Sequence, residues 1–513
     1  MRRVLVTGSL GYIGSVLTPY LQAEGFDCIG HDVGFFSGGL LYPPADTPTL
    51  FCDSRDIAPA DLDGVHAVVH LAGISNDPMG KLDAASVYDP TRLYAARLAR
   101  MCKHRGIAFV FASSCSVYGI GSEELLTESG PTQPQTGYSL NKLQIEEDLR
   151  ALADKTFSPI ALRFATIFGR SPRLRFDVVI NMLTGLAVTT GKIVLNSDGQ
   201  SWRPNLHILD ACRAVLAAID LDYDGGDLLV LNVGRDDNNL QVLDIAKAIQ
   251  RVVPGCELRF LSESPDLDTD GLIQDRKVRD GGRDTRTYKV SFEKIRRLMP
   301  QFSCEWTVED GARDMVALFD EIRLDTAMFR RREFYRLQQL EHLHGSGCLS
   351  DDLRWQIPGL SAVATAEGLE QAAGSPRRRH PKILHTQGDA WNRVFNFMMH
   401  DSYMQPHHHP AAGKIERIHL LEGKLAVLYF DEAGTVTDVI VLERGGREVV
   451  EVPGFTWHTY VMLSDSAITY ETMMGRYEPA TWKEFAGWAP PESSSASGAY
   501  LQTLKEACRT THG

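Results

Sequence analysis

The chain has 513 residues, a formal net charge of −13 and 43% hydrophobic residues, so we expect several globular domains rather than one core. Its acidic balance argues against a nucleic-acid partner, which needs a basic surface, and no apolar run is long enough to span a membrane. Nine scattered cysteines without a CxxC pair predict reduced thiols and a cytoplasmic protein. From residue 1 to about 170, β-rich runs alternate with helical segments, which predicts a parallel sheet covered on both faces. The expected strands are 3–7, 27–32, 67–71, 108–113 and 158–163.

The first strand leads into a glycine-punctuated turn, Thr7-Gly8-Ser9-Leu10-Gly11-Tyr12-Ile13-Gly14, that opens a helix. Glycines at such a turn let backbone N–H groups approach a pyrophosphate at the positive end of the helix. Asp32 ends the next expected strand, where its carboxylate would bind a ribose 2′-OH and repel a 2′-phosphate. The pattern predicts NAD rather than NADP as cofactor, unless Asp32 only caps a turn.

Several further segments share the order of the extended short-chain dehydrogenase/reductase family. They are Cys52-Asp53, His70-Leu71-Ala72-Gly73, residues 111–119 with Ser114, Tyr138-Ser139-Leu140-Asn141-Lys142, and residues 163–169. Together with the glycine turn, residues 3 to 320 resemble this family, the NAD-dependent epimerases and dehydratases of nucleotide sugars. The resemblance implies a Rossmann-type doubly wound sheet with a small substrate subdomain. It implies cofactor contacts at Gly8, Gly11, Tyr12, Ile13, Gly14, Asp32, Asp53, Leu71, Ala72, Gly73, Tyr138 and Lys142.

The resemblance makes Ser114, Tyr138 and Lys142 the catalytic residues, and elementary chemistry explains their types. A phenol has an unperturbed pKa near ~10, so tyrosine alone is a poor base at neutral pH. Lys142 lies four residues after Tyr138 on the same helical face, where its ammonium can stabilise the phenolate. Tyr138 could then take a proton from a sugar hydroxyl while hydride leaves for NAD⁺, with Ser114 holding the oxygen.

The residues after Ser114 bear on which reaction follows. Family members that dehydrate sugars carry an Asp-Glu pair there, whereas this chain has Cys115 and Ser116. We therefore expect 4-epimerisation or 4-keto reduction. The resemblance also implies that Ser114, Asn181, Arg203 and Arg286 bind a nucleotide-diphosphate sugar, although the last three could instead make ordinary surface contacts.

From about residue 359 short alternating runs predict an all-β sandwich or small barrel. The expected strands are 394–399, 415–421, 425–430, 436–442, 448–452 and 467–472. His407, His409, Glu416 and His458 have the order and types of cupin metal ligands, and such ligands suit Zn, Fe, Mn or Ni. His408 should point away, because neighbours on a strand face opposite sides. A metal-free barrel is the alternative.

The region resembles small cupin-fold metalloproteins of polysaccharide-biosynthesis gene clusters, and dehydrogenase–cupin fusions provide a precedent. We expect an epimerase/dehydratase-like domain at 1–325, a helical linker at 326–358, a cupin domain at 359–490 and a mobile tail at 491–513. The predicted protein is bifunctional, a homodimeric NAD-dependent epimerase or oxidoreductase fused to a metal-dependent sugar isomerase. The alternative is that the cupin is a non-catalytic sugar-binding or regulatory module.

Overall fold

The computed structural model forms two compact units, Met1–Trp355 and Gln356–Gly513. It describes residues 2–36, 39–45, 47–51, 53–75, 84–121, 124–261, 287–345, 348–385, 391–411, 414–475, 477–478 and 482–510. Within these residues no helix has both the length and the apolar character needed to cross a membrane.

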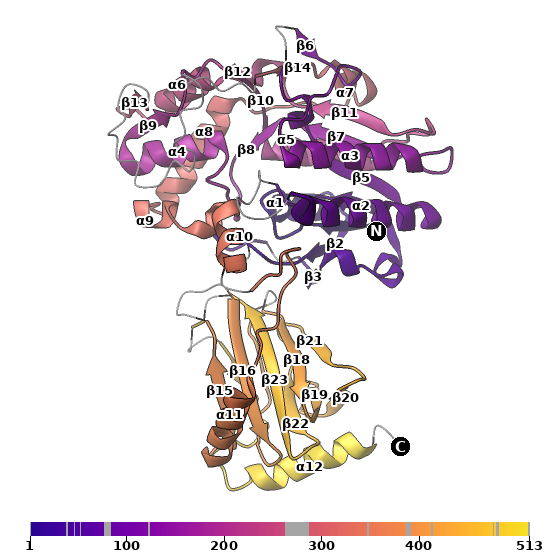
Figure 1. Cartoon of the computed structure of the whole chain (residues 1–513), viewed down its shortest axis with the longest axis vertical. Coiled ribbons are helices and arrows are strands. Elements are labelled where there is room, and N and C mark those ends of the chain that lie inside the picture. Colours follow the sequence, from indigo (N-terminus) through magenta and orange to yellow (C-terminus); the bar gives the residue numbers. More distant parts are fainter. Residues whose placement is uncertain are drawn as a thin grey trace. The chain divides into compact units, whose positions relative to one another are not determined.

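A seven-stranded parallel sheet forms the centre of the N-terminal unit (Figure 1). Its order is β11-β7-β5-β4-β1-β2-β3, so the chain runs outward from β1 in both directions, as in doubly wound folds. The predicted Rossmann-type sheet is confirmed, with two strands, β3 and β11, that the sequence did not indicate. The strands are β1 (Arg3–Thr7), β2 (Asp27–Asp32), β3 (Thr49–Phe51), β4 (Val65–His70), β5 (Ala108–Ser114), β7 (Ile160–Phe164) and β11 (Leu229–Val233).

Helices cover both faces of this sheet because alternate strand residues point to opposite sides. Val4 and Val6 share a core with α1 (Gly14–Ala23) and α5 (Ile208–Ile219), whereas Leu5 between them shares a core with the other face. That second face is covered by α2 (Ala84–Arg105) and α3 (Gly137–Leu152), which pack against each other (Figure 1).

A smaller subdomain is built from segments that alternate along the chain with the last strands of the sheet. It contains the three-stranded sheet β12-β10-β8 and the strand pairs β13-β9 and β14-β6. The strands are β6 (Leu125–Leu126), β8 (Thr166–Phe168), β9 (Lys192–Leu195), β10 (Trp202–His207), β12 (Asn239–Gln241), β13 (Glu257–Phe260) and β14 (Lys289–Val290). The helices are α4 (Val179–Thr190), α6 (Val242–Val252), α7 (Glu293–Leu298) and α8 (Val308–Glu321), the last of which begins with a capping box between Thr307 and Asp310.

The segment expected to be a linker packs against the N-terminal unit instead. It contains α9 (Thr326–Phe329), the 3₁₀ turn η6 (Arg332–Phe334) and α10 (Arg336–Gly345). Phe329, Phe334 and Tyr335 are buried in the core of the subdomain, and the indole N–H of Trp355 donates to the carbonyl of Val33 (2.8 Å). Buried aromatic residues therefore hold this segment against the N-terminal unit.

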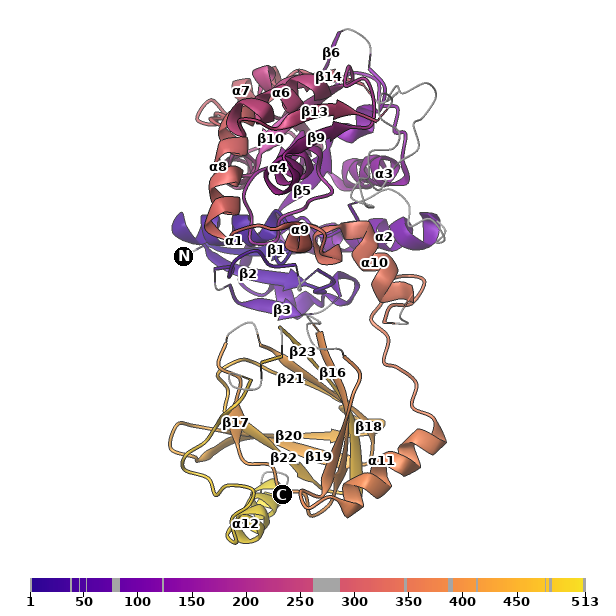
Figure 2. The same cartoon turned by 90° about the vertical axis from the view of Figure 1, so that its left-hand side faces the viewer.

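The C-terminal unit is built from two five-stranded antiparallel sheets, ordered β15-β16-β23-β18-β21 and β20-β19-β22-β17-β24. Side chains from both sheets form one core, including Ile418 and Val450 from the first and Val427 and Tyr460 from the second. The unit is therefore an antiparallel two-sheet structure, as the strand pattern predicted (Figure 2).

The strands of the first sheet are β15 (Arg379–Ile383), β16 (Trp391–Met399), β18 (Glu416–Glu422), β21 (Val449–Val452) and β23 (Ser466–Met474). Those of the second are β17 (His407–His408), β19 (Lys424–Phe430), β20 (Val436–Glu443), β22 (His458–Met462) and β24 (Glu484–Phe485).

Two helices, α11 (Ala362–Gly374) and α12 (Ser497–Thr510), lie outside these sheets (Figure 2). The second lies where a mobile tail was expected from residue 491. Its Leu501, Leu504 and Cys508 are buried against strand residues such as Ala426 and Val461. The serine-rich stretch before it led to the expectation of mobility, but the apolar residues at helical spacing that follow give the chain a face to bury.

Candidate cofactor, catalytic and metal sites

A cavity of the N-terminal unit lies at the carboxyl ends of β1, β2 and β4, where doubly wound folds bind ligands. Ten residues predicted to contact a dinucleotide all line this cavity: Gly8, Gly11, Tyr12, Ile13, Gly14, Asp32, Asp53, Leu71, Ala72 and Gly73. Tyr138 and Lys142, also predicted to contact the cofactor, come from α3.

Two glycines of the turn, Gly8 and Gly14, have no room for a side chain. Gly8 has a φ of +75°, and a Cβ there would lie 2.9 Å from the backbone nitrogen of Ala72. A Cβ on Gly14 would lie 2.2 Å from the carbonyl oxygen of Gly8. The turn therefore presents bare backbone at the start of α1, which fits the diphosphate of a dinucleotide.

Asp32 caps the turn and also lines the cavity. Its carboxylate accepts hydrogen bonds from the backbone N–H groups of Leu10 (2.9 Å) and Gly34 (2.7 Å). Burial raises the pKa of this carboxyl, and the two N–H donors oppose that shift. Asp32 can therefore cap the turn and also be available to a ribose, because the capping bonds hold its carboxylate at the cavity wall.

Tyr138 and Lys142 occupy successive turns of α3, which begins after Thr136, whose side chain caps it by accepting from Ser139 N–H (3.1 Å). The Lys142 ammonium donates to the carbonyl of Ala112 (2.7 Å) and lies 5.7 Å from the Tyr138 ring centroid. Burial lowers the pKa of Lys142 to about 8. One turn further on, Glu146 forms a buried ion pair with Arg163 of β7 (2.6 Å), which ties α3 to the sheet. Lys142 is therefore a buried cation fixed beside the Tyr138 ring.

A second cavity contains Tyr138 and shares Ser75 with the first. Arg203, predicted to bind the diphosphate of a sugar nucleotide, lines it, and so do Ser116, Gln135, Thr166 and Tyr288. Ser114, at the end of β5, accepts a hydrogen bond from the backbone N–H of Ser116 (3.2 Å). Tyr138, the predicted catalytic tyrosine, thus lines a cavity that adjoins the cavity of the glycine turn at Ser75.

The other predicted substrate residues are placed differently. The Asn181 side chain is fully buried, where its oxygen accepts from Gly169 N–H (3.1 Å) and its nitrogen donates to Arg175 O (3.0 Å) and to the Tyr12 hydroxyl (3.2 Å). These bonds give it a positioning role beneath the glycine turn rather than a place in the second cavity. Arg286 lies outside the described residues.

Cys115 and Ser116 form the start of a 3₁₀ turn, η3 (Cys115–Tyr118), directly after Ser114. The Cys115 thiol is buried and donates to the carbonyl of Arg163 (3.1 Å), and burial raises its pKa well above the usual range. The Ser116 hydroxyl is buried. Neither group can exchange a proton readily at neutral pH.

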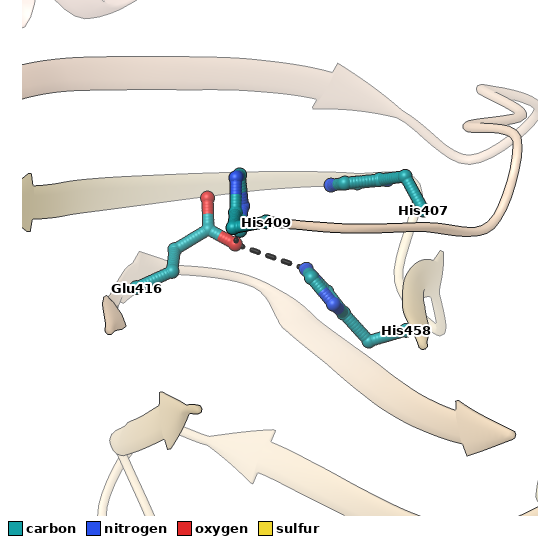
Figure 3. A group of neighbouring side chains, drawn as sticks. All are labelled: His407, His409, Glu416 and His458. Carbon is teal, nitrogen blue, oxygen red and sulfur yellow. Dashed lines mark hydrogen bonds and ion pairs between the residues drawn. The ribbon is translucent and has the colours of Figure 1, made fainter. Parts of the chain in front are cut away.

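The C-terminal unit brings together the four predicted metal ligands (Figure 3). One ligand atom from each of His407, His409, Glu416 and His458 lies within 4.8 Å of the other three, and all four side chains are buried. His407 pairs directly with His458 across β17 and β22, whereas Glu416 begins β18 of the other sheet. The cluster therefore lies between the two sheets.

Backbone carbonyls orient the three imidazoles. The Nδ1 atoms of His407, His409 and His458 contact the carbonyl oxygens of Gln405 (3.1 Å), Trp482 (2.8 Å) and Thr456 (2.8 Å). A carbonyl can only accept, so each Nδ1–H donates and each ring turns its Nε2 toward the cluster, where the Nε2 atoms of His458 and His409 lie 3.0 and 3.3 Å from Glu416 Oε2. The buried Nε2 of His407 has no hydrogen-bond partner among the described residues. This arrangement is the usual support of metal-binding histidines.

The electrostatics of the cluster also suit a cation. Burial alone would raise the pKa of the Glu416 carboxyl, but His409 and His458 hold it well below the usual range, so the carboxylate is ionised. Burial lowers the pKa of His407, which keeps that imidazole neutral. His408 has its ring edge-on to Trp457 (4.2 Å between centroids) and lies 3.4 Å from Glu484, away from the cluster.

Comparisons with known proteins support the predicted family of the N-terminal unit. Residues 4–234 match the model of the NAD dependent epimerase/dehydratase family. The N-terminal unit is an NAD-dependent epimerase/dehydratase domain. Residues 360–442 match a domain of unknown function, DUF6016, so a cupin assignment of the C-terminal unit gains no support there.

The relatives of the epimerase/dehydratase domain are enzymes. UDP-glucose 4-epimerase of Bacillus subtilis is 27% identical over 295 residues, which cover 48% of this chain and 81% of that protein. dTDP-glucose 4,6-dehydratase of Neisseria meningitidis is 27% identical over 341 residues, 62% of this chain and 92% of that protein. The structure of UDP-glucuronic acid 4-epimerase from Bacillus cereus, in complex with UDP-glucuronic acid and NAD, has the same fold. Its TM-score is 0.50 at 22% identity, covering 63% of this chain and 99% of that chain.

Sequence reasoning missed several residues that line the two cavities of the epimerase/dehydratase domain. Thr166 and Ser116 lie inside recognised segments, so their place in a motif was the available signal. Arg336, Asp352 and Leu353 line the cavity of the glycine turn although they follow the family match by about a hundred residues. No spacing within the glycine turn points to them.

Proposed function

We propose that this chain is a bifunctional nucleotide-sugar enzyme. Its N-terminal domain uses NAD to oxidise and reduce a sugar carbon, C4 in our proposal, and its C-terminal unit uses a divalent metal to isomerise a keto sugar. The observation that carries the proposal is the position of Tyr138, in a cavity that shares Ser75 with the cavity of the glycine turn. A sugar in the second cavity could therefore lie beside the nicotinamide of a dinucleotide in the first.

The side chains of this site supply the proton chemistry. NAD⁺, when bound, accepts hydride from the sugar carbon and can return it. Tyr138, as phenolate, takes the hydroxyl proton while the C–H bond breaks, which leaves a ketone. The Lys142 ammonium lowers the energy of the phenolate, and Ser114 is proposed to donate a hydrogen bond to the substrate oxygen. Reversal on the other face of the ketone gives the epimer, with no net oxidation.

Epimerisation or reduction is favoured over dehydration by the residues after Ser114. Loss of water from a keto sugar requires a base at one carbon and an acid at the next. The Cys115 thiol is buried and bonded to a backbone carbonyl, and Ser116 carries only a hydroxyl. At these two positions this chain therefore lacks the acid and the base that a dehydration would need.

The metal proposal for the C-terminal unit rests on the donor set and its support. Three Nε2 atoms and one carboxylate oxygen converge, and the carboxylate is the only anion in the cluster. Such a set suits Zn, Fe, Mn or Ni and can leave positions open to substrate. A metal bound to the oxygen of a keto sugar would acidify the neighbouring C–H, which is the chemistry that isomerisation needs.

The experiment is turnover of UDP- and dTDP-hexoses in D₂O, followed by NMR of the product. Epimerisation at C4 returns the original hydride, so C4 stays free of deuterium. Isomerisation by the C-terminal unit removes a proton next to the ketone and should place one solvent deuterium there. The product of the His409→Ala/His458→Ala variant should lack that deuterium, while the reaction at C4 continues. Deuterium at C4, or no change with any hexose, would refute the first half of the proposal. Unaltered labelling in the double variant would leave the C-terminal unit as a binding module.

We further propose a homodimer, because Leu93 of α2 and Leu140 of α3 are exposed apolar residues on two helices that pack together. Sedimentation of the purified protein tests this directly, and a monomer at micromolar concentration would contradict it.

A further inference from the structure

The segment after the epimerase/dehydratase fold covers one side of the cofactor cavity. We call its described residues, 332–345 and 348–355, the strap. Leu340, Leu343 and Leu353 of the strap share a hydrophobic cluster with Phe35 and Tyr88 of the domain. Within that packing Arg336, Asp352 and Leu353 reach the wall of the cavity.

Hydrogen bonds and ion pairs bind the C-terminal end of the strap, residues 352–354, to Arg55 and Asp56 of the domain. Arg55 Nη1 donates to the backbone oxygen of Asp352 (2.7 Å) and Nη2 donates to that of Leu353 (3.2 Å). Arg354 forms an ion pair with Asp56 (2.9 Å). Since Arg55 itself lines the cavity and Asp56 is the next residue, the strap is bound to the wall of the cavity.

Arg336 is the unusual residue of the strap. Its side chain is buried, its Cζ lies 4.0 Å from the ring centroid of Phe36, and its Nη2 has no hydrogen-bond partner among the described residues. The nearby Asp177 carboxylate is already paired with Arg175 (2.8 Å) and accepts the backbone N–H, not the guanidinium, of Arg336 (3.1 Å). Burial and the neighbouring Arg175 lower the pKa of Arg336 to about 9, so it is still charged at neutral pH.

A buried arginine without an ion-pair partner costs stability unless an anion pairs with it. Within the described residues no carboxylate forms an ion pair with Arg336. The guanidinium is a planar fork suited to phosphate oxygens, and it lines the same cavity as the glycine turn.

We propose that Arg336 binds the diphosphate of the dinucleotide, so that the strap holds the cofactor in the domain. The proposal rests on NAD use by this domain. The dinucleotide would pair the buried charge, with which no described carboxylate forms an ion pair, and the strap would in turn be stabilised by the cofactor. The arginine that would bind the diphosphate thus lies outside residues 4–234, which match the family model, but within the N-terminal unit.

The test is NAD binding by calorimetry, with Arg336→Met as the variant and Arg332→Met as the matched control from the same segment. Loss of one charge-assisted contact should weaken NAD binding by about ten- to a hundredfold. The control should bind as the parent does. Arg336→Lys keeps the charge without the fork and should lie between parent and Arg336→Met. ADP should lose affinity by the same factor as NAD, whereas adenosine, which has no phosphate, should be unaffected.

Thermal melting separates a ligand role from a structural one. Without NAD, Arg336→Met should melt no lower than the parent, because a buried unpaired charge has been removed. With NAD, its upward shift should be smaller than that of the parent. Equal NAD affinity in parent and variant would overturn the proposal, and so would a loss confined to 2′-AMP, which would place the arginine at a 2′-phosphate. Absence of NAD binding by the parent would instead refute the proposed function.

Discussion

The pH dependence of hydride transfer gives the sharpest test of the role assigned to Lys142. Burial lowers the pKa of this ammonium to about 8, below the ordinary lysine value of 10.5. The lysine is therefore charged below pH 8 and loses its charge as the pH rises through that value. If Tyr138 needs the ammonium to exist as phenolate, turnover should fall on the alkaline side.

The size of the effect follows from that pKa. A group with a pKa of about 8 is about nine-tenths charged at pH 7 and about one-tenth charged at pH 9. We expect the rate of NAD reduction in a single turnover to fall about tenfold between pH 7 and pH 9. Lys142→Arg, whose guanidinium stays charged over this range, should lack the alkaline fall if it retains activity.

The assay is NADH formation at saturating NAD and nucleotide sugar, with Lys142→Met as a second control. That variant should be at least about a hundredfold slower and show no alkaline limb. A parent rate that stays level from pH 7 to pH 9 would refute the argument, and so would an alkaline fall that persists unchanged in Lys142→Met.

Three further predictions concern the other sites. Tyr138→Phe should lose about a hundredfold or more in hydride transfer while NAD affinity, measured by calorimetry, stays near the parent value, because only the hydroxyl is removed; near-normal turnover would contradict the mechanism. The parent should contain one divalent metal per chain by elemental analysis, His409→Ala/His458→Ala should contain none, and His408→Ala should keep it; full metal in the double variant would refute the assignment. NAD should bind more tightly than NADP because the Asp32 carboxylate lies at the cavity wall, and tenfold tighter NADP binding would overturn that interpretation of Asp32.

The sequence predicted best where several residues had to satisfy one local geometry. The glycine turn is an example, because Gly8 and Gly14 have no space for a side chain and the motif spacing reflects that crowding. In the His407-x-His409 segment, His407 and His409 belong to the cluster and His408 does not, as expected from strand alternation, although β17 itself ends at His408.

Contacts made by tertiary packing were less accessible. Asn181 matched a substrate position, yet its amide is used by Gly169, Arg175 and the Tyr12 hydroxyl, which no linear pattern indicates. Residues 326–358 were expected to be a helical linker, but Phe334 and Tyr335 bury their rings in the N-terminal unit. The spacing of apolar residues predicts that a segment is helical, but it does not predict the surface against which the helix packs.

The location of the histidine cluster has a consequence for how the C-terminal unit folds. Glu416 comes from one sheet and His407 and His458 from the other, so an ion held by all of them would join the sheets from within. Metal affinity and the cooperativity of unfolding would then be two measures of a single equilibrium. Without the proposed ion the two sheets would keep their shared hydrophobic core but lose this additional link between them. If the proposed ion binds there, it would stabilise the folded unit in addition to serving the proposed isomerisation.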